Sequence, residues 1–96
     1  MRISEYEKSA IIDSVKSVDL DAGIWLFGSR TDDSKKGGDI DIAILSKEIN
    51  MDVMQKIQIR RFICNKIGDQ KIDIVTSKDG QEAFFRLAME EGIKLQ

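Results

Sequence analysis

Two aspartates separated by a single residue, Asp39 and Asp41, are the side chains of this 96-residue chain best suited to chemistry. They lie in an apolar segment, and successive side chains of a β-strand alternate between faces, so both carboxylates would project the same way. Neighbouring carboxylates repel each other, and burying them is costly without compensation. A divalent cation supplies that compensation, and Mg²⁺ or Mn²⁺ prefers hard oxygen ligands. The pair indicates a candidate metal site, although the solvated face of an amphipathic strand has the same pattern.

A third carboxylate, Asp73, lies in a second alternating apolar segment. If the two segments form adjacent parallel strands, Asp73 can lie level with the Asp39 and Asp41 pair on one face of the sheet. Two metal ions held by such a cluster could bind nucleoside triphosphate oxygens and stabilise an in-line attack. Taken alone, Asp73 is equally consistent with a solvent-facing residue on an alternating strand.

A Gly-Ser dipeptide, Gly28-Ser29, directly follows another apolar segment. Gly28 lacks a Cβ and so permits close backbone approach, and the backbone N–H groups with the Ser29 hydroxyl could hold a phosphate. Arg30 could offset the charge of a terminal phosphate, as could Lys35 or Lys36 from the polar segment that follows. Taken alone, Gly28-Ser29 is more often an ordinary turn after a strand, and the lysine segment is most simply a solvated loop.

The composition excludes several classes of protein. The chain has no His and one Cys, Cys64, which excludes Ser-His-Asp and Cys-His catalysis, an intramolecular disulfide and a cysteine-based structural zinc site. The net charge of −2 provides no basic field for duplex nucleic acid. No apolar run reaches the length of a membrane span and no signal peptide is evident, so we expect a soluble cytoplasmic protein. The size predicts one domain over residues 1–96.

Alternating helices and strands are expected to position these residues. Ser4 and Glu7 form the pattern of a capping box at the start of the first helix. We expect helices over 3–18, 51–67 and 81–91, strands over 24–27, 39–45 and 71–76, and a short tail over 93–95. The apolar faces of the last two helices are expected at Met54, Ile57 and Cys64, and at Ala83, Phe84, Leu87 and Ala88.

The lengths of the connections predict the topology of the sheet. The polar segment 30–38 is short for a crossover, so the first two strands should be antiparallel, which brings Gly28 near Asp39. A long helix joins the second and third strands, so these should be parallel, as in a β-α-β unit. The fold class is therefore α/β (α+β), a small mixed sheet of about three to four strands flanked by helices.

The chain resembles the DNA polymerase β-type nucleotidyltransferase superfamily, and most closely its small prokaryotic branch, the minimal nucleotidyltransferases. The similarity rests on Phe27-Gly28-Ser29-Arg30, on the nine residues between Ser29 and Asp39, and on the segment from Asp39 to Ile44. It extends from the first helix to the third strand and implies a polymerase β-like fold. One departure is Gly38, which stands where the small branch often has Ser, so the loop is looser and one hydroxyl is lost.

The resemblance also implies roles for individual residues. It assigns nucleotide binding to Gly28, Ser29 and Arg30, and both catalysis and the binding of two Mg²⁺ ions to Asp39, Asp41 and Asp73. Mn²⁺ is an alternative to Mg²⁺, and Asp73 would help to activate the attacking hydroxyl. Larger relatives add domains that bind the base and the acceptor, which this chain lacks, so acceptor binding would require a partner or a second copy in a homo-oligomer.

Similar small proteins are commonly encoded beside a HEPN-domain protein as toxin–antitoxin pairs. The resemblance therefore implies transfer of NMP, in particular AMP from ATP, to a hydroxyl such as a tyrosine of a partner HEPN toxin. Two alternatives stay open: a non-catalytic antitoxin that masks a partner by contact alone, and a small antibiotic-modifying enzyme, which the lack of an acceptor domain disfavours. The nucleotide, the acceptor, the oligomeric state and activity in isolation are left open by the sequence.

Overall fold

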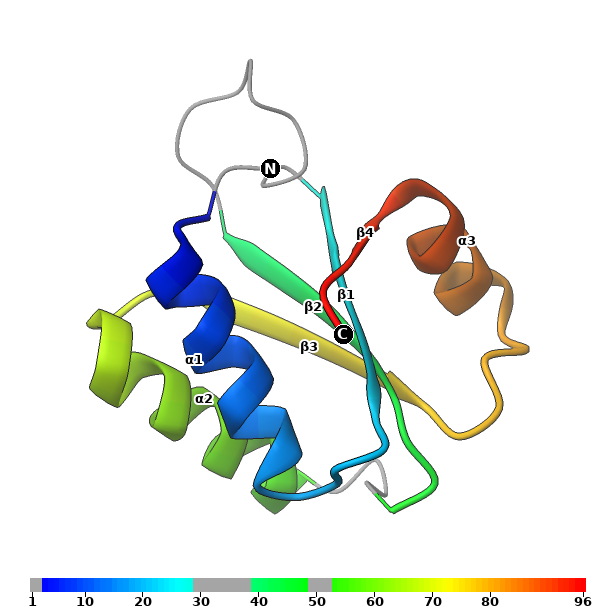
Figure 1. The fold of residues 1–96 in the computed structure, drawn as a ribbon. Helices are drawn as coiled ribbons and strands as arrows, with labels where there is room; N and C mark the ends of the chain where they lie inside the picture. The colour runs from blue at the N-terminus through cyan, green and yellow to red at the C-terminus, as the bar shows by residue number, and fades with distance from the viewer. Residues whose placement is uncertain (1–2, 29–38, 49–52) are drawn as a thin grey trace.

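The structure, a computed structural model, describes residues 3–28, 39–48 and 53–96 and is organised around a mixed β-sheet (Figure 1). Its helices are α1 (Glu5–Lys16), α2 (Val53–Ile67) and α3 (Ala83–Glu91), and its strands are β1 (Gly23–Phe27), β2 (Ile40–Leu45), β3 (Ile72–Ser77) and β4 (Ile93–Lys94). The four strands lie in the order β3-β2-β1-β4. Helices α1 and α2 cover one face of the sheet and α3 lies on the other, so the fold is the expected α+β arrangement.

The pairing of the three long strands confirms the predicted topology. Strand β1 runs antiparallel to β2, and β2 runs parallel to β3 through the α2 crossover. The expected C-terminal tail instead forms β4, a two-residue strand antiparallel to β1 that pairs Trp25 with Lys94 and Leu26 with Ile93. Strand β1 therefore has neighbours on both sides, as its continuous apolar sequence predicts.

The start of α1 follows from its local sequence. The Ser4 hydroxyl accepts a hydrogen bond from the Glu7 backbone N–H at 3.0 Å, and the Glu7 carboxylate accepts one from the Ser4 N–H at 2.8 Å. This reciprocal pair is the predicted capping box, and it satisfies two backbone donors that the helix leaves free.

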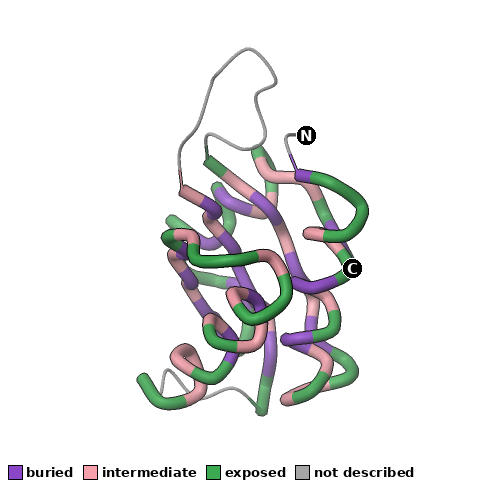
Figure 2. Tube along the Cα trace, turned by 90° about the vertical axis from the view of Figure 1, so that its left-hand side faces the viewer, coloured by how far each residue is buried: buried purple, intermediate pink, exposed green. Residues whose placement is uncertain are grey.

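The main core lies between the sheet and the pair α1 and α2. Alternate residues of the strands point into it and are at most 5% exposed: Ile24, Leu26, Ile40, Ile42, Ile44, Ile72 and Ile74. The alternation of buried and more exposed positions along each strand is visible in Figure 2. Each fully buried Ile or Leu contributes about 1.5–3 kcal/mol relative to an exposed one, so this layer dominates the stability of the domain.

The inward faces of two helices differ from the prediction. Helix α2 buries Ile59 and Ile63, while Met54 is 64% exposed and Cys64 is only partly buried. Helix α3 buries Phe85 and Ala88, whereas the expected core residues Phe84 and Leu87 are each 52% exposed. The Phe85 ring packs edge-on against Trp25, with 6.1 Å between ring centroids, and this contact sets the rotation of α3 on the sheet.

Within the described ranges, no helix combines the length and apolar character needed to cross a lipid bilayer.

Candidate functional site

Two aspartates meet at the beginning of two parallel strands. Asp41 on β2 is directly in register with Asp73 on β3, and both side chains are half-buried on the sheet face that carries α3. Besides burial, a side-chain hydrogen bond with Asp73 is one of the causes that raise the pKa of the Asp41 carboxyl. The β-α-β connection thus produces the predicted meeting of carboxylates from neighbouring strands.

The electrostatics of this pair favour a bound cation. Burial raises the pKa of the Asp41 carboxyl, and the charge of Asp73, its hydrogen bond and the charge of Asp39 raise that pKa further, whereas Lys71 lowers it. The raised pKa means that the negative form of Asp41 is disfavoured where it stands. A positive charge among these oxygens would reverse that preference and stabilise the ionised carboxylates.

Gly28 lies against the same carboxyl group. It follows Phe27, which pairs with Asp41 across the antiparallel β1–β2 ladder. Its φ of +76° belongs to the left-handed region that favours glycine. A Cβ at this position would overlap a carboxylate oxygen of Asp41, so any other residue would displace that side chain. The absence of a Cβ therefore lets the Asp41 carboxylate lie directly against the Gly28 backbone.

Asp39, expected to be the first residue of the strand, instead immediately precedes β2 and forms an ion pair with Lys71. The Lys71 Nζ lies 3.5 Å from Asp39 Oδ2, and the two side chains are 73% and 42% exposed. A backbone hydrogen bond from the Ile40 N–H to the Lys71 carbonyl, 3.1 Å long, fixes the two strand entrances side by side. The charge of Asp39 therefore helps to raise the pKa of Asp41, but the Asp39 carboxylate itself is paired with Lys71.

Four of the six predicted site residues are brought together: Gly28, Asp39, Asp41 and Asp73. Ser29 and Arg30, with the lysines of the following segment, lie outside the described residues. In the part of the chain that is described, no group of three or more acidic, His or Cys side chains is gathered as a metal-binding cluster. The donor set still fits a hard divalent ion, because it consists of carboxylate oxygens that repel one another beside the backbone of Gly28.

Two basic residues near the site were not assigned a role from the sequence. Lys71 lies opposite Asp39, and its position two residues before Asp73 on an extended segment is the signal that could have revealed it. Arg60 is half-buried and donates a hydrogen bond from Nε to the carbonyl of Ile72 at 2.8 Å. Arg60 thereby ties α2 to the outer strand β3, one residue from Asp73.

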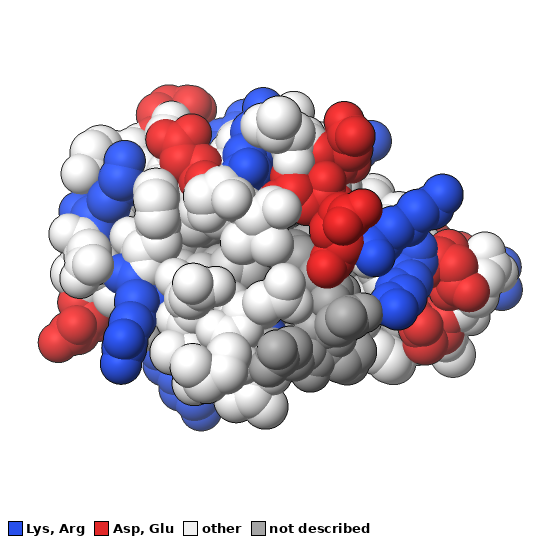
Figure 3. Space-filling model, turned by 90° about the horizontal axis from the view of Figure 1, so that it is seen from below, with Lys and Arg blue, Asp and Glu red and all other residues white. Residues whose placement is uncertain are grey.

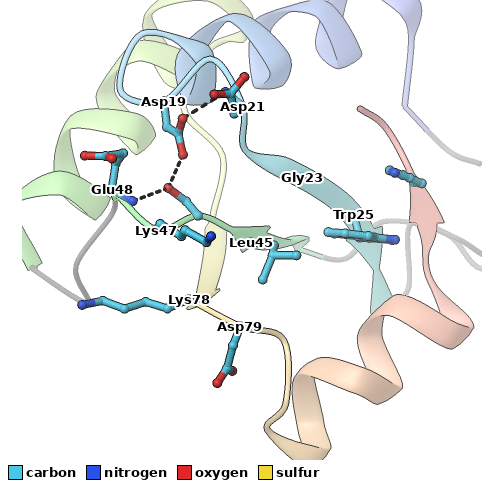
Figure 4. Close-up of a pocket in the computed structure, with 11 residues that line it drawn as sticks. Asp19, Asp21, Gly23, Trp25, Leu45, Lys47, Glu48, Lys78 and Asp79 are labelled. Atoms are coloured by element: carbon cyan, nitrogen blue, oxygen red, sulfur yellow. Dashed lines mark hydrogen bonds between the residues drawn. The ribbon is translucent and has the colours of Figure 1, made fainter.

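A separate cavity of about 650 Å³ lies at the other end of the sheet (Figure 4). Trp25 and Leu45 line it together with acidic and basic side chains, among them Asp19 and Lys78. The Ser46 hydroxyl donates to Asp19 at 2.5 Å and accepts from the Glu48 N–H at 3.1 Å, which fixes one wall. Leu45 is four residues from Asp41 along β2, about 13 Å at the usual rise of a strand. The predicted carboxylates therefore lie outside this cavity.

Charges of both signs are distributed over the surface. Seen from below the view of Figure 1, acidic and basic side chains form separate small groups, with neither sign covering the face (Figure 3). This matches the net charge of −2 over the whole sequence. The local clustering of carboxylates at Asp41 and Asp73 is therefore a property of the site and not of a generally acidic protein.

The fold and the site together define a class: an α+β domain whose mixed sheet presents paired carboxylates beside a glycine at a strand end. A family model described as Polymerase beta, Nucleotidyltransferase matches residues 10–96. The chain therefore belongs to the polymerase β nucleotidyltransferase family, for which a nucleoside triphosphate substrate and divalent metal ions are typical. A comparison with curated protein sequences gives no significant match.

Proposed function

We propose that this protein is a Mg²⁺-dependent nucleotidyltransferase that transfers NMP, in particular AMP from ATP, to a hydroxyl group. The observation that supports this most directly is the pairing of Asp41 with Asp73 in register beside Gly28. Membership of the nucleotidyltransferase family supports the same reaction class. Asp39, Asp41 and Asp73 would hold two Mg²⁺ ions, or Mn²⁺ in their place, and the bound ions would neutralise charge on the triphosphate and polarise its phosphorus centres.

The chain's own residues would perform the remaining steps. The turn at Gly28, which lies against the Asp41 carboxylate, is proposed to bind the triphosphate, with Ser29 and Arg30 as further contacts to it. The acceptor hydroxyl oxygen attacks the α-phosphorus in line with the leaving group, and its proton passes to the Asp73 carboxylate. A new bond forms between the oxygen and the α-phosphorus, the bond from the α-phosphorus to the bridging oxygen breaks, and pyrophosphate leaves with that electron pair.

The acceptor that we propose is a tyrosine of a partner HEPN-domain toxin, with this chain acting as the antitoxin. The motif resemblance to the minimal nucleotidyltransferases supports this assignment. A second copy of the chain could complete the acceptor site in a homo-oligomer.

Incubation of the purified protein with α-labelled ATP, Mg²⁺ and the HEPN-domain protein encoded beside it would test the proposal. We expect label on the partner in the presence of Mg²⁺, and a Tyr→Phe change at the labelled partner residue should remove it. Chelation of the metal with EDTA should abolish the label. Wild-type protein that labels no such partner under these conditions would contradict the transfer reaction.

One observation favours a second candidate function, a non-catalytic antitoxin that masks its partner by contact. Asp39 is paired with Lys71, so the three carboxylates are not assembled as a metal-binding group among the described residues. Calorimetry with Mg²⁺-ATP separates the two functions. A nucleotidyltransferase should bind Mg²⁺-ATP in a metal-dependent manner. A contact-only antitoxin should neutralise the toxin without binding the nucleotide.

A further inference from the structure

Lys71 places a positive charge beside one of the site carboxylates, Asp39. Its Nζ lies 3.5 Å from Asp39 Oδ2, and its charge also lowers the pKa of Asp41. A lysine ammonium is a compact point charge on a flexible stem, so it can stand in electrostatically for a metal ion. Within the described ranges no group of three carboxylates is gathered as a metal site, and Asp39 is paired with Lys71.

The backbone around Lys71 is fixed while its side chain is free to move. The Lys71 carbonyl accepts a hydrogen bond from the Ile40 N–H, which anchors the residue beside the entrance of β2. The side chain itself is 73% exposed, so its ammonium group can leave Asp39 without disturbing the packed core. An exposed ion pair of this kind contributes little to stability, and a divalent ion can displace it.

We propose that Lys71 is a built-in competitor of the metal, an internal counter-ion that holds Asp39 until a divalent cation displaces it and so sets the metal affinity of the site. This inference rests on the proposed function, because it concerns the same carboxylates. Lys71 acts here as a positioning residue for Asp39. Its presence limits binding of the free metal ion and holds the carboxylates near one another while no metal is bound.

The test is the affinity for Mn²⁺ alone, measured by calorimetry and by the electron paramagnetic resonance signal of the free ion. Removal of the competing charge in Lys71→Met should tighten Mn²⁺ binding about fivefold, since one positive charge close to a divalent ion is removed. Lys71→Arg keeps the charge and should bind within about twofold of wild type. Lys66→Met is the control, because Lys66 forms an ion pair with Asp13 away from the site, at 3.9 Å, with side chains 43% and 57% exposed.

A double-mutant cycle with Asp39→Asn distinguishes competition between Lys71 and the metal for Asp39 from general repulsion between Lys71 and the metal ion. If Lys71 acts through Asp39, the gain from Lys71→Met should fall to about twofold or less in the Asp39→Asn background. Equal or weaker Mn²⁺ binding by Lys71→Met, with wild-type binding intact, would overturn the competitor role and leave the nucleotidyltransferase assignment standing. Absence of Mn²⁺ binding by both wild type and Lys71→Met would overturn the metal site and the competitor role together.

Discussion

The two faces of the sheet follow the same alternation of side chains but have different physical roles. On the face toward α1 and α2, Ile40, Ile42 and Ile44 of β2 are completely buried. On the opposite face the same strand presents Asp41 at its start, Ala43 under α3 and Leu45 at the distant cavity. One face is packed and apolar from end to end, while the other is covered only in its middle. The comparison shows how a small domain keeps repelling carboxylates, because the opposite face provides the stability.

The difference between the faces can be tested by substitution. Changes on the packed face should reduce stability, and changes at the carboxylate end of the other face should affect ligand binding and transfer. The expected effects below run from the largest to the smallest.

Asp41→Asn should have the largest effect, and that effect should be on activity. We expect NMP transfer to fall by about 100- to 1000-fold or more, the scale observed when one preorganised electrostatic group is removed from an active site. The fold should be retained or slightly stabilised, because the change removes repulsion with Asp73 and Asp39. Label transfer and a thermal melt measure the two properties. Loss of folding in this variant would contradict the division of roles between the faces.

Ile42→Ala should differ from Asp41→Asn, because its main effect should be on the stability of the fold. Ile42 is 0% exposed on the face toward α1 and α2, so its truncation should cost about 2–5 kcal/mol of unfolding free energy. Urea denaturation followed by circular dichroism measures this loss. Val53→Ala is the matched aliphatic control, because Val53 is 66% exposed and its truncation should change stability by about 0.5 kcal/mol or less. A similar cost at both positions would argue against a core on this face.

Gly28→Ala tests whether the glycine preserves space at the carboxylates. The left-handed φ of +76° alone should cost about 1–2 kcal/mol of stability for an alanine. The Cβ should also displace the Asp41 carboxylate and weaken Mn²⁺ binding. Gly68→Ala is the matched control, because Gly68 has a φ of +91° but no neighbouring atom within 4 Å of the point that a Cβ would occupy. Equal Mn²⁺ affinity in both variants would show that the space at Gly28 is not required.

The pH dependence of stability should show the smallest effect. The folded-state pKa of Asp41 is raised, so the folded protein binds this proton more tightly than the unfolded chain does. The resulting stabilisation is complete below the unfolded pKa and is lost as pH rises through the folded pKa. Wild type should therefore lose melting temperature relative to Asp41→Asn as pH rises through that range, and Mn²⁺ should restore part of it. Parallel melting curves against pH for the two proteins would contradict the raised pKa.

The local pattern was sufficient to predict the three long strands and the meeting of Asp41 with Asp73. Alternation determines the face of each residue, and the length of a connection determines whether its strands are parallel, so both properties can be deduced from neighbouring residues. The helix faces were not predictable in the same way. On α3 the stripes through Phe84 and through Phe85 both have helical spacing, and only the contact of Phe85 with Trp25 selects between them.

The sequence by itself indicated a candidate carboxylate metal site beside a glycine turn, and its motif resemblance indicated the class of chemistry. Tertiary structure alone decided that residues 93–94 add a strand to β1 and that Lys71 pairs with Asp39. The physical reason is that strand alternation and helix capping depend on residues close in sequence. Which strand forms the edge of a sheet, and which residue pairs with a charged side chain, depend on the distant segments that packing of the core places next to each other.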